Sequence, residues 1–161
     1  METTILGRTG LAVSRLGFGG APAGLRNYLS TYSPDDAEQR RTVIRALERA
    51  VELGITYFDT APAYGQGASE GIYGEALQGL GDRVVVATKV SPDVVDVRAS
   101  VERSLNRLRR DRLDLVQIHG SSYSLAQAEA FLAPGGMVAQ MEALRDEGLI
   151  RFLGFTTEDN N

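Results

Sequence analysis

The sequence predicts an α/β fold in which parallel strands form a sheet and helices cover it. Three observations predict this. Strand-like and helix-like segments alternate strictly along the chain, each strand-like segment is apolar at consecutive positions, and turn or capping residues separate the segments. Strands that are apolar on both sides are typical of a parallel sheet buried by the helices that connect its strands.

The chain opens with a predicted β-hairpin. Residues 3–13 consist of two short apolar stretches around a turn that Gly7 and Gly10 bracket. The first strand of the parallel sheet is then expected near residues 15–19, where it runs into a glycine-rich loop.

The first long helix is predicted to begin within residues 33–36. Ser33 suits the N-cap, Pro34 suits the first helical position, and two aspartates follow in the first turn. Apolar residues at helical spacing continue from there, and Gly54 is expected to end the helix.

The remaining elements continue the alternation. Strands are predicted near residues 55–59, 84–89, 113–119 and 150–155, and helices over roughly 69–79, 97–108 and 138–148. The total is five strands and four helices in one domain, residues 1–161. A closed eight-stranded barrel takes about 250 residues, so we expect these 161 residues to be part of a longer protein. We also expect self-association, because the first and fifth strands would leave open sheet edges.

Composition excludes several kinds of site and partner. The chain has no cysteine and one histidine, which excludes disulfides and thiolate chemistry and leaves no ordinary ligand set for a metal. A net charge of −4 gives no reason to expect nucleic acid or a membrane surface as partner. The amino terminus lacks signal-peptide features, and no apolar run approaches the roughly 20 residues of a membrane span, so we expect a cytoplasmic location.

Five arginines lie close together in residues 103–112. They could form a phosphate-binding patch or the solvated end of a helix. We expect the solvated face, because basic residues are favoured in the last turn of a helix.

Polar residues stand at the carboxyl ends of three consecutive predicted strands, which end in Asp59, Lys89 and His119. Ligands bind at these ends in parallel α/β folds, and adjacent strands lie about 4.8 Å apart, so the three side chains can converge. One interpretation is a structural ion pair between Asp59 and Lys89 with His119 hydrogen-bonded nearby. We favour a functional site, because all three residues occupy equivalent strand ends.

Tyr64 follows in the glycine-rich loop 60–67. A free phenol has a pKa of about 10, roughly three units too high for acid catalysis at neutral pH. The cation of Lys89 would make the phenol a stronger acid, and Asp59 would keep Lys89 charged in a site of low dielectric.

These residues lie in segments that resemble the aldo-keto reductases. The resemblance rests on the segments 58–65, 87–90 and 114–119, on Ser69-Glu70, and on the hairpin, which is similar to the plug under that family's barrel. It implies a TIM (β/α)₈ barrel of aldo-keto reductase type, present here through about strand 5. It also implies reduction of aldehyde or ketone carbonyls, including those of sugars, or the reverse reaction. Tyr64 would be the general acid and base, Lys89 and Asp59 would adjust its acidity, and His119 would orient the carbonyl.

The same resemblance implies NADP(H) as cofactor, with NAD(H) as the alternative. Gly19, Gly20 and Asp59 would lie beside it, together with Thr156 and Thr157 after the fifth strand. The family often has Ser-Asn at the last two positions. A threonine hydroxyl can replace serine, but Thr157 cannot reproduce the amide of asparagine. The family binds the cofactor phosphates from loops after strands seven and eight, which this stretch does not include.

Several other functions compete with this interpretation. Residues 67–71 fit the G-x-S-x-G pattern of α/β-hydrolases, but Ser69 lies ten residues after the strand and is better explained as a helix N-cap. A Rossmann fingerprint would need glycine where Glu70 stands, and no phosphate-loop pattern occurs. A lyase using Lys89 as a Schiff base and a non-catalytic, reductase-like binding subunit are the remaining alternatives.

Overall fold

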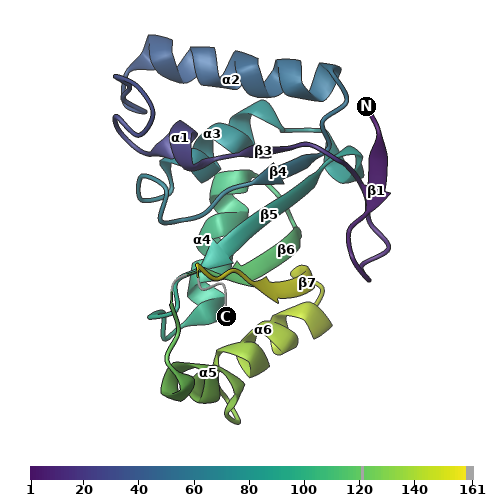
Figure 1. Ribbon diagram of the computed structural model, residues 1–161, viewed down its shortest axis with the longest axis vertical. Helices are drawn as coiled ribbons and strands as arrows, with labels where there is room; N and C mark the ends of the chain where they lie inside the picture. Colours follow the sequence, from purple (N-terminus) through teal and green to yellow (C-terminus); the bar gives the residue numbers. More distant parts are fainter. Residues whose placement is uncertain (121, 159–161) are drawn as a thin grey trace.

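A five-stranded parallel sheet forms the centre of the molecule. The computed structural model describes residues 1–120 and 122–158. The strands lie in chain order, β3-β4-β5-β6-β7, with every neighbouring pair parallel. Their bounds are β3 Gly17–Gly19, β4 Tyr57–Asp59, β5 Val85–Val90, β6 Leu113–Ile118 and β7 Ile150–Phe155. The α/β fold and the five predicted strands are therefore confirmed (Figure 1).

The helices follow one another around the sheet, from α2 at the top of Figure 1 to α6 at the bottom. They are α1 Ala21–Gly24, α2 Ala37–Glu52, α3 Ala68–Ala76, α4 Val97–Leu108, α5 Leu125–Leu132 and α6 Met137–Asp146, with a short 3₁₀ helix, η1, at Gly81–Arg83. The sequence did not predict α1, α5 or η1. The core packs between strands and helices, and includes Phe58, Val86, Val116, Leu47, Ile72, Val101 and Met141. In the described part of the chain, none of the helices has the length and apolar character needed to cross a bilayer.

The predicted hairpin is present. Its strands are β1 Thr3–Ile5 and β2 Ala12–Ser14, paired antiparallel. Ser14 and Thr56 join the hairpin to the sheet through two hydrogen bonds, because each backbone N–H donates to the other residue's hydroxyl, at 2.8 and 2.9 Å. Thr56 directly precedes β4, so the hairpin lies at the amino ends of the strands.

Two predicted helix starts were wrong in detail. Asp36, not Ser33, is the N-cap of α2, because its carboxylate accepts hydrogen bonds from the backbone N–H groups of Glu38 and Gln39. Ser69 is not a cap either. Helix α3 begins at Ala68 after Gly67, and the buried Ser69 hydroxyl donates to the Gly20 carbonyl at 2.8 Å. Ser69 therefore ties α3 to the end of β3.

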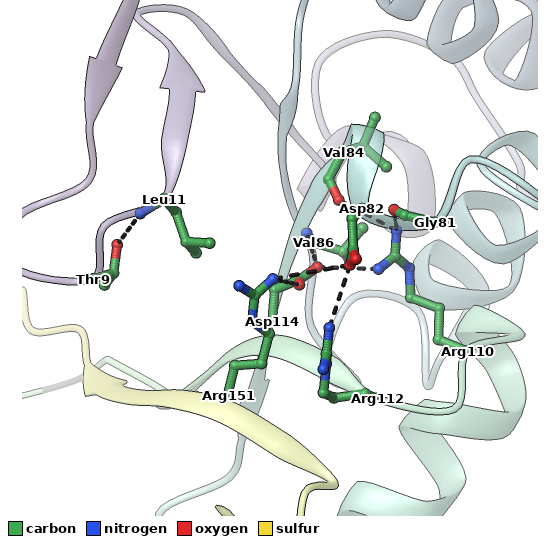
Figure 2. A network of polar contacts seen from close by, with 10 residues as sticks. All are labelled: Thr9, Leu11, Gly81, Asp82, Val84, Val86, Arg110, Arg112, Asp114 and Arg151. Atoms are coloured by element: carbon green, nitrogen blue, oxygen red, sulfur yellow. Dashed lines mark hydrogen bonds and ion pairs between the residues drawn. The ribbon is translucent and has the colours of Figure 1, made fainter.

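The arginine run does not form a simple solvated face, which corrects the expectation. Arg110 donates to Asp114 at 3.0 Å, and Arg151 of β7 reaches the same carboxylate at 3.2 Å (Figure 2). Asp114 is only 2% exposed and also accepts from the backbone N–H of Val86. The buried carboxylate attracts these cations from other elements, so this network links β5, β6 and β7 near their amino ends.

A second arginine of the run is also paired. Arg107 donates to the buried Glu70 at 3.1 Å, and Glu70 accepts a further hydrogen bond from the Thr88 hydroxyl at 2.6 Å. Helix α4 is thereby joined to α3 and β5. A cleft of about 460 Å³ opens beside the arginine network and is lined by Leu77, Gly79, Asp82 and Arg112 among others. It lies away from the carboxyl ends of the strands.

Candidate active site at the carboxyl ends of the strands

The structure brings together Asp59, Tyr64, Lys89 and His119. Asp59 ends β4, Lys89 lies in β5 and His119 follows β6, so all three come from the same edge of the sheet. The Lys89 ammonium is 2.6 Å from Asp59 Oδ1 and 5.3 Å from the centre of the Tyr64 ring. The rings of Tyr64 and His119 meet edge to face with their centres 5.5 Å apart. The predicted convergence of these side chains is therefore present.

Lys89 is a buried cation with two polar partners. Its side chain is 5% exposed, and its ammonium donates to Asp59 Oδ1 and, at 2.9 Å, to the carbonyl of Thr60. A charged group in such a site is stable only when its charge and hydrogen bonds are satisfied. The pair fixes both side chains at the strand ends.

Tyr64 is held in place by close backbone packing. A Cβ atom added to Gly65 would lie 2.1 Å from the carbonyl oxygen of Gly24, and one added to Gly24 would lie 2.2 Å from the carbonyl oxygen of Tyr64. Gly65 also has a φ of +67°, a conformation that glycine adopts readily. The end of α1 thus rests directly on the backbone that carries Tyr64.

The acidity of Tyr64 differs from the sequence expectation. Burial raises the pKa of Tyr64, and the negative charge of Asp59 raises it further. Lys89 was expected to lower this pKa, and in this structure the lowering does not prevail. The physical reason is that burial disfavours the phenolate and that the Asp59 carboxylate, paired with Lys89 at 2.6 Å, opposes the effect of the lysine cation. Tyr64 is therefore a protonated phenol at neutral pH.

His119 is neutral at neutral pH. Burial lowers the pKa of His119, and the nearby Lys89 cation lowers it further, while Asp59 and Glu158 act in the opposite direction. The residue is fixed through its backbone, because its N–H donates to the carbonyl of Val90 at 2.8 Å. The hydroxyl of Tyr123 donates a short hydrogen bond to the carbonyl of His119. Sequence reasoning missed Tyr123, since a lone aromatic residue in a loop carries no distinguishing pattern.

The two glycines expected beside a cofactor differ in their surroundings. A Cβ atom on Gly19 would meet nothing within 4 Å, and Gly19 lies opposite Asp59 in the strand register. A Cβ atom on Gly20 would lie 2.6 Å from the Ser69 hydroxyl and 2.8 Å from the Asp59 carbonyl. Gly20 is thus required by packing, whereas Gly19 leaves open space next to the polar cluster.

Thr156 and Thr157 directly follow β7 at the same edge of the sheet. The hydroxyl of Thr156 accepts a hydrogen bond from the backbone N–H of Gly120 and lies 3.5 Å from the carbonyl of Ile118. These contacts join the ends of β6 and β7. The Thr156 hydroxyl therefore already has partners within the protein.

In this arrangement the Tyr64 phenol can transfer a proton next to the imidazole of His119. The arrangement offers a protonated phenol, a neutral imidazole and a paired lysine in one place. Among residues 1–120 and 122–158, no group of three His, Asp or Glu side chains could hold a metal ion.

Comparisons with known proteins agree on one family. The model of the Aldo/keto reductase family matches residues 15–160. Among curated proteins, methylglyoxal reductase YeaE of Escherichia coli is 40% identical over 131 residues, which cover 80% of this chain and 43% of that protein. L-galactose dehydrogenase of Arabidopsis thaliana is 34% identical over 167 residues, which cover 97% of this chain and 48% of that protein. The chain thus spans about half the length of the curated relatives it matches.

Solved structures give the same result. Aldo-keto reductase AKR11C1 from Bacillus halodurans, in its holo form, superposes with a TM-score of 0.77 at 31% identity, over 98% of this chain and 51% of that one. An aldo-keto reductase from Klebsiella pneumoniae in complex with NADPH superposes with a TM-score of 0.76 at 31% identity, over 99% of this chain and 50% of that one.

Proposed function

This chain belongs to the aldo/keto reductase family, and we propose that it provides the catalytic residues of an NADP(H)-dependent reductase of aldehydes or ketones. The observation that carries the proposal is the convergence of Tyr64, His119 and the Lys89–Asp59 pair at one edge of the sheet. Relatives whose names specify methylglyoxal and L-galactose point to small carbonyl compounds and sugars as substrates.

In this proposal Tyr64 moves the proton. Its phenol donates to the carbonyl oxygen during reduction and accepts the proton back during oxidation. A positioned acid of this kind is worth about 10²–10⁴-fold in rate. The raised pKa of Tyr64 keeps the proton in place at neutral pH, so the donor is present before the substrate arrives.

His119 and Lys89 position the reacting groups. The neutral imidazole of His119 offers an N–H to the carbonyl oxygen and, being edge-on to Tyr64, directs that oxygen toward the phenol. Lys89 places a cation 5.3 Å from the Tyr64 ring, where it stabilises the phenolate as the proton leaves. Asp59 holds Lys89 in this position.

The residues at the strand ends fit the nicotinamide part of the cofactor. When bound, NADP(H) supplies or accepts a hydride at the carbonyl carbon, and NAD(H) is the alternative. Gly19 leaves open space beside Asp59, and we propose that the nicotinamide occupies it. Gly20, Thr156 and Thr157 would form the edge of this site, with Thr156 acting through its backbone because its hydroxyl is already bonded.

We further propose that residues 1–161 act as one domain, the amino-terminal half of an eight-stranded barrel completed by further polypeptide. The sheet of the described residues has two open edges, at β3 and β7, and relatives are about twice as long. A cytoplasmic location, where reduced cofactor is available, is part of this proposal.

The Schiff-base alternative is disfavoured by the same geometry. Asp59 at 2.6 Å favours the protonated form of Lys89, and a protonated amine is not a nucleophile. Lys89 is the only lysine of residues 1–161, so borohydride trapping of a carbonyl substrate on this stretch would report on this residue and the amino terminus alone. A stable adduct on Lys89 would support the lyase.

The proposed function can be tested with protein expressed from its complete reading frame. Methylglyoxal and L-galactose are offered with each cofactor in both directions, and the nicotinamide absorbance is followed. We expect turnover with NADPH or NADH that Lys89→Met nearly abolishes. Cofactor binding without turnover of any carbonyl would instead identify a non-catalytic binding subunit.

A further inference from the structure

The segments that follow β6 and β7 contact each other directly. The backbone N–H of Thr156 donates to the carbonyl of Ile118 at 3.0 Å, and the backbone N–H of Gly120 donates to the Thr156 hydroxyl. A Cβ atom added to Gly120 would lie 2.6 Å from that hydroxyl, so the two segments leave no space between them. His119 and Thr156, which have separate roles in the proposed function, are therefore carried by backbone segments that touch.

The side chain of Tyr123 contacts both of these segments. Its hydroxyl donates a short hydrogen bond to the carbonyl of His119 and lies 3.3 Å from the carbonyl of Thr156. A phenol has a single proton to donate, so the bond to His119 is the strong one and the contact with Thr156 is the weaker branch. One phenol thus reaches the backbone of the residue proposed to orient the carbonyl and the backbone of a residue proposed to border the cofactor.

The Tyr123 ring is itself fixed by packing. It meets the Phe131 ring of α5 edge to face, with the ring centres 5.4 Å apart and the ring planes at 90°. Both rings are partly buried and pack against the hydrophobic core. Such an aromatic pair is favourable and restricts the direction in which the Tyr123 hydroxyl points. Helix α5, which buries none of its residues, is thereby connected to the edge of the sheet that carries the candidate site.

The position of the His119 imidazole depends on the backbone that carries it. The backbone N–H of His119 donates to the carbonyl of Val90 at 2.8 Å, and its carbonyl accepts from Tyr123, so both polar backbone groups of this residue are fixed. A shift of this backbone would move the imidazole relative to the Tyr64 phenol, with which it is in edge-to-face contact. Misplacement of a reacting group by about 1 Å can cost roughly 10²-fold in rate.

We propose that Tyr123 is a positioning residue of the active site, whose hydroxyl fixes the backbone of His119 and of Thr156 relative to each other. The imidazole that orients the carbonyl and the edge of the cofactor site then keep one spacing. Tyr123 acts through these two residues and takes no part in proton transfer. This inference rests on the proposed function and adds a residue to it.

Tyr123→Phe tests this role, because it removes the hydroxyl and keeps the ring that packs against Phe131. Tyr73→Phe is the matched control. The Tyr73 hydroxyl also donates to a backbone carbonyl, that of Phe18 in β3, at 3.2 Å, and its ring likewise packs edge to face against another aromatic ring. Both variants are made in protein expressed from its complete reading frame, and thermal unfolding compares their stability.

The activity is measured with methylglyoxal and NADPH, and proton NMR follows the imidazole of His119, whose signals are assigned from their loss in His119→Asn. We expect both phenylalanine variants to lose a similar, small amount of stability. Tyr123→Phe alone should lower kcat about tenfold, with the KM for methylglyoxal changed less than about twofold, because alignment and not binding is lost. Tyr123→Phe should also shift the His119 signals and weaken NADPH binding, whereas Tyr73→Phe should do neither.

A Tyr123→Phe variant that matches Tyr73→Phe in kcat and in the His119 spectrum would overturn the proposal and leave Tyr123 a purely structural residue. A lowered kcat with unchanged His119 signals would overturn it as well, because the effect would not pass through His119. If the unmodified protein reduces no carbonyl compound, the proposed function itself fails. The NMR comparison of the two variants then decides by itself whether Tyr123 fixes His119.

Discussion

Lys89 donates a 2.6 Å hydrogen bond to Asp59, and its ammonium lies 5.3 Å from the centre of the Tyr64 ring. The pKa of Tyr64 is raised, first by burial and second by the Asp59 carboxylate. The ion pair therefore has two effects. It satisfies the charge of a buried cation, and its carboxylate adds to the raised pKa of Tyr64.

Asp59→Asn tests this relationship. Removing the carboxylate exposes the phenol to an unpaired cation, so the pKa of Tyr64 should fall relative to the unmodified protein. The measurement is an alkaline absorbance titration of phenolate, with the Tyr64→Phe background subtracted to isolate this one tyrosine. Loss of one partner of a largely buried pair should also cost about 3 kcal/mol of stability. Asp82→Asn, an exposed acid at the other end of the sheet, is the control, and an unchanged Tyr64 titration in Asp59→Asn would contradict the account.

His119 is the only histidine, so its titration can be followed directly by proton NMR. Its pKa is lowered by burial and by Lys89, and the midpoint should lie below the ordinary value of about 6.5. The unfolded chain then binds a proton at a higher pH than the folded one. Stability should consequently fall as the pH drops below about 6.5, down to the folded midpoint.

Lys89→Met should raise that midpoint, because it removes a cation and leaves Asp59 unpaired near the imidazole. Arg98→Met, which removes an exposed cation of α4, serves as the control. A His119 midpoint that stays the same in Lys89→Met would show that the two side chains are not coupled.

Much of the fold could be predicted from the sequence, because its signals are local. The apolar runs 113–118 and 150–155 identified β6 and β7, and Gly54 and Gly148, both with positive φ, follow the ends of α2 and α6 as expected. Helix α5 was missed because it buries none of its residues and so lacks a clear apolar stripe. Ser69 was misread because its partners, Gly20 and Thr60, are distant in sequence.

The candidate site could likewise be predicted only where its signals are local in the sequence. Asp59, Lys89 and His119 were placed by their positions at strand ends, which is local information. The raised pKa of Tyr64 depends first on burial, which is not visible in a sequence pattern, and second on the charge of Asp59. The arginine run was likewise misread, because Asp114 binds arginines from two different elements.

Asp114→Asn should destabilise the protein by about 3 kcal/mol, because Arg110 and Arg151 would lose the carboxylate that compensates their charges. Asp82→Asn should change the free energy of unfolding by less than about 0.5 kcal/mol, because Asp82 is 79% exposed and its ion pairs are solvated. Urea denaturation of both variants measures the difference. Equal losses would mean that the buried network of Figure 2 contributes no more than a surface ion pair.

Residues 1–161 alone should self-associate through the open edges of β3 and β7. Sedimentation velocity should therefore show species larger than a monomer. Phe155→Lys, at the exposed end of β7, should reduce the association, whereas Leu132→Lys on α5 should not. The same chain should bind NADPH weakly, because the loops proposed to hold the phosphates are not in it. Micromolar cofactor binding by a stable monomer would contradict this expectation.

The most direct test of the account is the rate of carbonyl reduction by Tyr64→Phe in protein expressed from its complete reading frame. Tyr57→Phe is the matched control, because it removes a phenol from β4, two residues before Asp59, that has no proposed part in the reaction. If Tyr64 is the proton donor, Tyr64→Phe should lower the rate by about 10²-fold or more, leave cofactor affinity within about twofold, and differ sharply from Tyr57→Phe. A Tyr64→Phe variant that keeps more than about a tenth of the rate would contradict the role of Tyr64 as general acid.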